Sequence, residues 1–200
     1  MPAVSPPSSR SPGVSCRTMV QAAAFLLTSA GIVWISRRCL RSPRSHGFYR
    51  FFAFEFIAAL IVVNAPLWFR DPFSPRQLAS WVLLFCSIWP AVAGLRLLVS
   101  AGRPAAESSD PAQLGFEKTT TLVAAGMYRY IRHPMYASLL GLAWGAALKD
   151  LSAPSLVLAL AASLSVIATA LAEEREDLAH FGPSYAEYMK TTRRFIPFVF

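Results

Sequence analysis

Five long apolar runs are the feature that most limits what this sequence can fold into. In chain order they cover Val20–Ser36, Phe48–Phe69, Leu78–Val99, Pro134–Leu148 and Ser152–Ala172. A helix needs about 20 apolar residues to cross the hydrocarbon core of a bilayer, and only the fourth run falls well short of that length. The sequence therefore predicts an all-α integral membrane protein with about five transmembrane helices.

The composition supports this prediction. Hydrophobic residues make up 54% of the 200 residues, and charged residues make up 15%. Ordinary soluble domains carry about 25% charged residues, so a soluble domain of this composition would expose much of its apolar content. The same hydrophobicity excludes disorder away from the chain ends.

The chain divides into a tail and one domain. Residues 1–18 are rich in Pro, Ser and Arg and are expected to form a disordered tail. Met19 stands just before the first apolar run, and we hypothesise that it is the true start of translation. Residues 19–200 are expected to form a single membrane-embedded domain, with a cofactor-binding part at about 118–200.

The loops between the runs differ in charge. Only Lys149-Asp150-Leu151 separates the fourth run from the fifth, so these two are expected to form a tight helical hairpin. With five spans, 14 Lys and Arg residues fall on one side of the membrane and 5 on the other. The positive-inside rule places the richer side in the cytoplasm, with the N-terminus outside and the C-terminus inside. A bacterial inner membrane is the expected location.

The remaining composition narrows the expected partners. The net charge is +8. In a membrane protein, basic residues set the orientation in the membrane and contact anionic lipids, so the expected partners are membrane lipids rather than nucleic acid. The three cysteines form no CxxC pair, and the three histidines have no metal-ligand spacing, so no metal site is expected. Nothing indicates an obligate protein partner.

Ionisable residues inside apolar runs are costly and are usually paired or functional. Glu55 in the second run and Arg96 in the third share a depth, so we predict that they pair. The alternative is that Arg96 faces a substrate. Asn64, deep in the second run, is expected to bond between helices rather than to bind a ligand.

Two polar stretches stand where the membrane architecture does not require them. The first is residues 122–136, in which Arg132-His133 directly precede Pro134, a residue suited to the first position of a helix. A helix start favours an anion. The second is the acidic run Glu173–Asp177 and the residues after it, which could hold a cationic ligand or ribose hydroxyls. Both stretches fall on the predicted cytoplasmic side.

Together the stretches read LVxxGxYxxxRHPxY and EE…FGxxYxxY…RFIP, over about Leu122–Phe198. This order resembles the isoprenylcysteine carboxyl methyltransferase and phospholipid methyltransferase group of membrane enzymes. The resemblance implies S-adenosylmethionine as cofactor and a cytoplasmic pocket without a Rossmann domain, and the chain indeed contains no GxGxxG. Two positions depart from the pattern, since Ser138 replaces a glycine and Asp177 replaces a leucine.

The resemblance also implies roles for individual residues. The cofactor-binding set that it implies is Tyr128, Arg132, His133, Pro134, Tyr136, Glu173 and Glu174. Arg194 and Arg96 are candidates for orienting the acceptor. Methyl transfer from a sulfonium needs alignment and exclusion of water, so no residue is required as a nucleophile.

These residues predict methyl transfer to a lipophilic acceptor, namely a prenylcysteine-like carboxylate, a thiol or a lipid head group. One alternative is an NADPH-dependent membrane reductase, in which Arg129, Arg132 and Arg194 would meet the 2′-phosphate. Another is a non-catalytic membrane scaffold or small transporter. Some of these residues also have interpretations without a ligand. The tyrosines could anchor helices at the membrane interface, and Arg193 and Arg194 could serve only to orient the protein in the membrane.

Overall fold

A computed structural model describes residues 12–101 and 122–197 of the chain. The helices are α1 (Pro12–Ser36), α2 (His46–Asn64), α3 (Pro75–Ala101), α4 (Pro134–Ala147), α5 (Ala153–Phe181) and α6 (Pro183–Thr191). Three short 3-10 turns accompany them: η1 (Cys39–Arg41), η2 (Ala65–Leu67) and η3 (Gly126–Arg129). The described residues contain no strand beyond one isolated bridge, so the predicted all-α class is confirmed.

Four of these helices are long and apolar enough to cross a membrane. They are α1, α2 together with η2, α3 and α5. α4 has 14 residues, which corresponds to about 21 Å of helix against a hydrocarbon core of about 30 Å. The fourth apolar run is thus a helix, but one too short to span a bilayer by itself.

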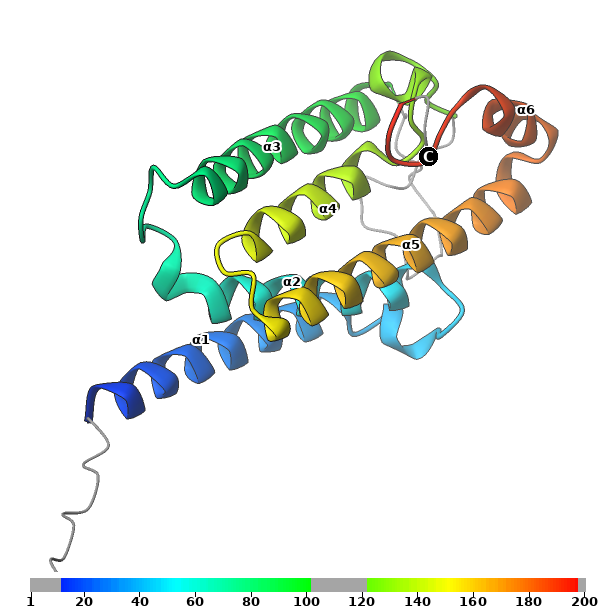
Figure 1. Ribbon diagram of the computed structural model, residues 1–200. Helices are drawn as coiled ribbons and strands as arrows, with labels where there is room; N and C mark the ends of the chain where they lie inside the picture. Colours follow the sequence, from blue (N-terminus) through cyan, green and yellow to red (C-terminus); the bar gives the residue numbers. More distant parts are fainter. Residues whose placement is uncertain (1–11, 102–121, 198–200) are drawn as a thin grey trace, which may run out of the picture.

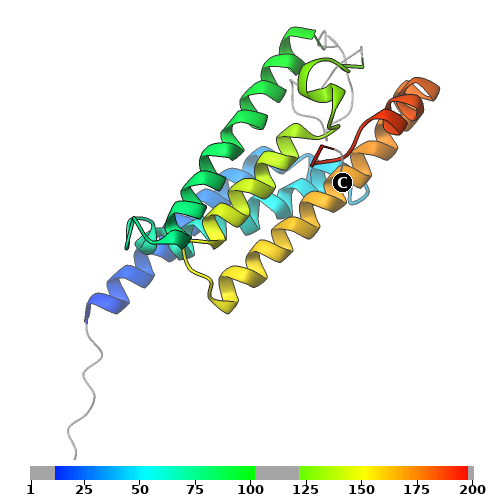
Figure 2. The same ribbon diagram turned by 45° about the horizontal axis from the view of Figure 1, so that its top comes forward.

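The short helix lies in the middle of the bundle. α4 packs along α3 on one side and against α5 and α2 on the other, and α2 packs along most of α5 (Figure 1, Figure 2). α1 lies on the outer side of α2. Because long helices flank α4, the side chains of the polar residues just before it, Arg132 and His133, are buried at the end of the bundle.

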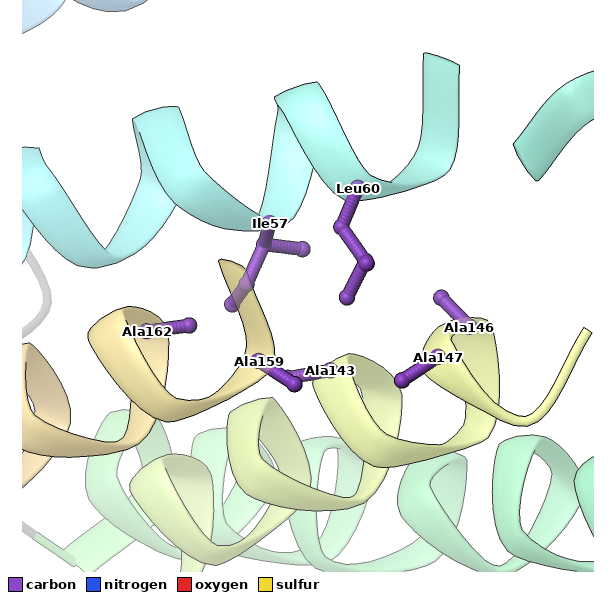
Figure 3. Packing of buried hydrophobic residues seen from close by; sticks show 7 residues of the cluster. All are labelled: Ile57, Leu60, Ala143, Ala146, Ala147, Ala159 and Ala162. Carbon is purple, nitrogen blue, oxygen red and sulfur yellow. The ribbon is translucent and has the colours of Figure 1, made fainter. Parts of the chain in front are cut away.

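Small side chains allow α2, α4 and α5 to approach one another closely. Ile57 and Leu60 of α2 point into the space between the other two helices, as Figure 3 shows. The side chains that face them are Ala143, Ala146, Ala147, Ala159 and Ala162, all fully buried. Small residues at helix interfaces are typical of membrane bundles, because packing rather than water exclusion drives association there.

Two glycines set the contact between α3 and α4. A Cβ atom at Gly145 would lie 2.8 Å from Leu84 side-chain atoms, and one at Gly141 would lie 2.9 Å from the Ser87 Cβ. A larger side chain would push the helices apart. The absence of side chains at these two positions therefore fixes how closely α4 lies against α3.

Polar side chains from three helices hold the C-terminal end of α4. Asn64 Nδ2 donates to the Ala146 carbonyl at 3.0 Å, and Ser80 Oγ donates to the Gly145 carbonyl at 2.6 Å. Ser155 Oγ in turn donates to Asn64 Oδ1 at 3.1 Å. The prediction that Asn64 bonds between helices is confirmed.

The α4–α5 hairpin is anchored at its tip by a buried cation. Lys149 is fully buried, and its Nζ donates to Gln77 Oε1 at 2.9 Å while lying 3.6 Å from the Trp81 ring centroid. Burial lowers the pKa of this ammonium group. The aromatic face and the amide replace part of the hydration that burial removes.

Two sequence expectations change here. Glu55 Oε1 accepts a hydrogen bond from Ser29 of α1 at 3.0 Å, whereas Arg96 is exposed on α3, and no ion pair joins the two within the described ranges. The predicted Glu55–Arg96 pair is wrong, because equal depth does not make α2 and α3 adjacent. The expected tail of residues 1–18 lies partly outside the described residues, and α1 begins within it, at Pro12.

Candidate functional site

Segments far apart in the sequence meet at one end of the bundle. The end of α3, turn η3, the start of α4, the end of α5 and α6 all reach this end (Figure 1, Figure 2). Gly182, with φ of +58°, makes the left-handed turn that separates α5 from α6. A residue with a side chain would be strained there, so the glycine fixes where α6 folds back.

The C-terminal segment, residues 192–195, is bonded to the backbone just before α4. Arg132 N donates to the Arg193 carbonyl at 2.7 Å, and Arg193 N donates to the Tyr130 carbonyl at 3.0 Å. His133 N donates to the Arg194 carbonyl at 3.0 Å. This parallel pairing joins residues some 60 positions apart and places both predicted motifs in one site.

A pocket lies between these segments. Its empty space is about 640 Å³, part of which is open to solvent. The side chains that line it come from the end of α3, from η3 and the residues before it, from the start of α4 and the two residues before it, from the end of α5 and from α6. They are Leu98, Leu122, Val123, Tyr128, Arg132, His133, Pro134, Met135, Tyr136, Glu173, Asp177, Phe181, Tyr185 and Tyr188. Six of the seven residues of the predicted cofactor set are among them.

Glu174, the seventh residue, is not among the lining residues and instead bonds to two arginines. Its Oε1 accepts from Arg132 Nε at 2.8 Å, and its Oε2 accepts from Arg194 Nη2 at 3.0 Å and from Arg194 Nε at 3.1 Å. The Glu174 side chain is only 4% exposed. Such a doubly paired carboxylate holds α5, the start of α4 and the C-terminal segment together.

Arg132 makes further contacts on the side away from Glu174. Its Nη1 donates to the Thr192 carbonyl at 2.6 Å and to the Met189 carbonyl at 3.2 Å. Thr192 Oγ1 donates to the Tyr188 carbonyl at 2.7 Å. Arg132 therefore donates hydrogen bonds both to a carbonyl of α6 and to a carbonyl of the C-terminal segment.

His133 is buried between the two glutamates. Its Nδ1 lies 3.6 Å from Glu173 Oε2, and its Nε2 lies 3.5 Å from Glu174 Oε1. The ring stacks on Tyr136 with a centroid distance of 5.3 Å. Both Glu173 Oε2 and His133 Nε2 are buried and lack a hydrogen-bond partner within the described part of the chain. Buried polar atoms of this kind call for a partner, and a bound ligand can supply one.

Two tyrosines of α6, Tyr185 and Tyr188, also line the pocket. The Tyr188 hydroxyl donates to the Tyr128 carbonyl at 2.5 Å, which ties α6 to η3. Burial, together with the Asp177 carboxylate, raises the pKa of both Tyr185 and Tyr188. These hydroxyls therefore keep their protons at neutral pH and act as donors.

The two candidates for orienting the acceptor have different surroundings. Arg194 is engaged with Glu174 and has a side chain that is 28% exposed. Arg96 is exposed on α3 and is not among the residues that line the pocket. The α3 residue that does reach the pocket is Leu98.

Several lining residues were not predicted. Asp177 and Phe181 follow Glu173 at steps of four along α5, and this spacing would have identified them as neighbours on one helix face. Tyr185 and Tyr188 belong to the quoted motif but were assigned no role. Leu122 and Val123 open the first quoted motif and were likewise assigned no role, whereas Leu98 carried no comparable signal.

Comparisons with known proteins agree with this geometry. A sequence profile of the phospholipid methyltransferase family matches residues 77–183, a little over half of the chain. The cobalt-zinc-cadmium resistance protein CzcN of Cupriavidus metallidurans is 41% identical over 81 residues, which cover 40% of this chain and 37% of that protein. No solved structure was found to match. Since the family match covers more than half of the chain, including most of α3, all of α4 and α5, and both glutamates, the chain belongs to the phospholipid methyltransferase family.

Proposed function

We propose that this protein transfers a methyl group from S-adenosylmethionine to a lipophilic acceptor at the membrane interface. One observation carries the proposal: Glu173 and His133 line the pocket, and Glu173 Oε2 and His133 Nε2 are buried without a hydrogen-bond partner among the described residues. A cofactor with hydroxyl and ammonium donors satisfies the carboxylate. Family membership supports methyl transfer as the class of reaction.

The residues present fit this cofactor. Glu173 would accept hydrogen bonds from the ribose hydroxyls or the ammonium group, and the phenol rings of Tyr136, Tyr185 and Tyr188 would face its cationic end. Aromatic faces attract cations within about 6 Å. When bound, the cofactor supplies a methyl group that is already activated by the positive sulfur.

The chain itself aligns the reactants and excludes water. The Glu174 pairs hold Arg132 in place, and with it the start of α4. Methyl transfer breaks one carbon–sulfur bond and forms one bond to the acceptor, so no residue of the chain needs to form a covalent intermediate. Glu174 acts here as a positioning residue, while Glu173 contacts the cofactor.

The pocket also has an apolar side. Leu98, Val123 and Met135 line it where α3 meets the start of α4. A lipophilic acceptor that moves within the bilayer would meet these side chains first. The acceptor atom, whether a carboxylate, a thiol or a lipid head group, is left open, and Arg194 orients a negative group only if it loosens its hold on Glu174.

The NADPH reductase alternative is less well supported. It needs cations to hold the 2′-phosphate, yet Arg132 and Arg194 are both paired with Glu174, and Arg129 is exposed and does not line the pocket. Family membership also gives this alternative no support. In a non-catalytic scaffold, no ligand would supply a hydrogen bond to the buried Glu173 Oε2.

Calorimetry on detergent-purified protein tests the proposal. We expect saturable binding of S-adenosylmethionine, no comparable binding of NADPH, and at least about tenfold weaker cofactor binding in Glu173→Gln, which removes a charged acceptor. Glu187→Gln is the matched control, because its side chain is 70% exposed on α6. Absence of S-adenosylmethionine binding by a folded protein would refute the proposal.

A further inference from the structure

Four arginines lie close together in the turn between α1 and α2. Arg37, Arg38, Arg41 and Arg44 are all exposed. We call these four residues the arginine patch. The first acidic residue of the whole sequence is Glu55, and within the described ranges no acidic side chain pairs with the patch. The patch therefore carries an uncompensated positive charge.

The patch stands where lipid head groups are. α1 is long and apolar enough to cross the membrane, and its span ends at Ser36, one residue before the patch. Trp34, 66% exposed, lies in the last turn of that span, and the Arg37 guanidinium lies 5.0 Å from its ring centroid. Tryptophan side chains favour the head-group level of a bilayer. A bilayer crossed by α1 would therefore bring its lipid phosphates beside these guanidinium groups.

At the other end of the bundle, two arginines have carboxylates nearby. Arg70 lies 3.7 Å from Asp71, and Arg76 lies 3.8 Å from Asp150. Both arginines have a carboxylate nearby and so have less need of an outside anion. Arg17, near the start of α1, is exposed and has no carboxylate partner among the described residues, so that end carries one unpaired arginine where the turn between α1 and α2 carries four.

That end is also the pocket end. The backbone N of His46, the first residue of α2, donates to Glu176 Oε1 at 2.9 Å, and the His46 ring bonds to the same carboxylate. Glu176 lies in the acidic turn of α5 that lines the pocket through Glu173 and Asp177. A lipid held by the patch would lie at the same membrane interface as the pocket.

We infer that the arginine patch is a binding surface for the phosphate-bearing head group of an anionic phospholipid. The surface is distinct from the pocket and does not depend on the proposed methyl transfer. Guanidinium groups bind phosphate oxygens in pairs, and each arginine near an anionic membrane surface strengthens binding by about fivefold. If the arginine patch served only to orient the protein in the membrane, it would not need to prefer one lipid over another.

Fluorescence quenching by brominated lipids tests this surface, because Trp34 lies beside Arg37. The full-length protein is reconstituted in phosphatidylcholine vesicles that contain either brominated phosphatidylglycerol or brominated phosphatidylcholine. The contribution of Trp34 is the difference from the Trp34→Phe variant. We expect the brominated phosphatidylglycerol to quench Trp34 several-fold more effectively, and this preference to shrink as salt screens the charges.

Two double variants complete the design. Arg38→Gln with Arg41→Gln should bring the lipid preference to parity, while Arg37 and Arg44 remain to hold the orientation. Arg70→Gln with Arg76→Gln removes the same charge at the other end and should leave the preference of Trp34 unchanged. Equal quenching by both lipids in the unaltered protein, or loss of preference in both double variants, would overturn the inference.

A free anion is the competing source of phosphate. Inorganic phosphate and sodium chloride are therefore compared at equal ionic strength. If a lipid is bound, both salts reduce the quenching preference to the same extent. A larger reduction by inorganic phosphate would show that the patch takes a free phosphate, and the lipid assignment would be wrong.

Discussion

Glu174 is a single carboxylate on which three elements depend. It pairs with Arg132 ahead of α4 and with Arg194 in the C-terminal segment, and the Arg132 and Glu174 side chains are 7% and 4% exposed. Removing one partner of a buried pair leaves the other charge without compensation. Glu174→Gln should therefore lower the free energy of unfolding by about 3 kcal/mol.

Thermal unfolding of the detergent-purified protein measures this loss. Glu187→Gln serves again as control, because exposed pairs such as Glu187–Lys190 contribute about 1 kcal/mol or less. Glu173→Gln should unfold close to the original temperature while binding cofactor poorly. If Glu174→Gln unfolds like the unaltered protein, Glu174 does not have the positioning role assigned to it.

The two α6 tyrosines predict a dependence on alkaline pH. Burial raises the pKa of Tyr185 and Tyr188 above their ordinary value of about 10. Above pH 10 the unfolded chain loses these protons while the folded chain retains them, so stability falls as pH rises. Tyr188→Phe should reduce this fall, whereas Tyr49→Phe on α2 should not. Equal slopes of unfolding temperature against pH in all three proteins would contradict the prediction.

For single residues, the sequence predicted which side chains come together at one site but not the direction in which each side chain points. Six of the seven residues in the predicted cofactor set line the pocket. Glu173 and Glu174 are about 100° apart around α5, and the rotation of that helix depends on its packing against α2 and α4. Sequence alone therefore could not show that Glu173 faces the pocket while Glu174 faces the arginines.

Among the elements, α4 is the one whose position depends most on small residues. A Cβ at Gly145 would lie 2.8 Å from the Leu84 side chain and 3.2 Å from its backbone N, so Gly145→Ala must shift α3 or α4. We expect a loss of about 1–3 kcal/mol, typical of overpacking. Gly31→Ala on α1 is the matched control, because nothing lies within 4 Å of the added atom.

The comparison of these two glycines is a measurement of unfolding temperature. Gly31→Ala should be neutral or slightly stabilising, since alanine favours a helix more than glycine does. A similar loss in both variants would mean that helix propensity, and not the α3–α4 contact, decides the outcome at Gly145.

The element boundaries show what apolar runs can and cannot predict. The run Pro134–Leu148 corresponds closely to α4, because Pro134 suits a first helical turn. The fifth run was placed at Ser152–Ala172, yet α5 continues to Phe181. Polar residues ended the run without ending the helix, and the break comes only at Gly182. The short helix α6 was not predicted, since its composition is polar.

For the molecule as a whole, orientation in the membrane is the open prediction. The pocket end carries most of the basic loops, so we expect it in the cytoplasm. Single cysteines at Phe73, 86% exposed before α3, and at Lys190 on α6 test this once Cys16, Cys39 and Cys86 are all replaced by Ser. A membrane-impermeant maleimide should label position 73 in intact cells and position 190 only after lysis. The reverse pattern would invert the orientation.

The arrangement of the bundle was less predictable than its class. Hydropathy gave five helices but not that the shortest lies at the centre, because length says nothing about neighbours. The error over Glu55 and Arg96 has the same origin. Neighbour relations come from side-chain shape, such as the alanines of α4 and α5 that receive Ile57.

The pairing of residues 130–133 with the C-terminal segment has a consequence for biosynthesis. The ribosome makes the chain from its N-terminus, so every membrane helix is synthesised before Arg193 and Arg194 emerge. The backbone hydrogen bonds that their carbonyls accept from Arg132 and His133 cannot form until then. A nascent chain therefore inserts its membrane helices before these bonds exist, and a chain cut before residue 192 would keep its helices but lack the bonds that hold the residues just before α4.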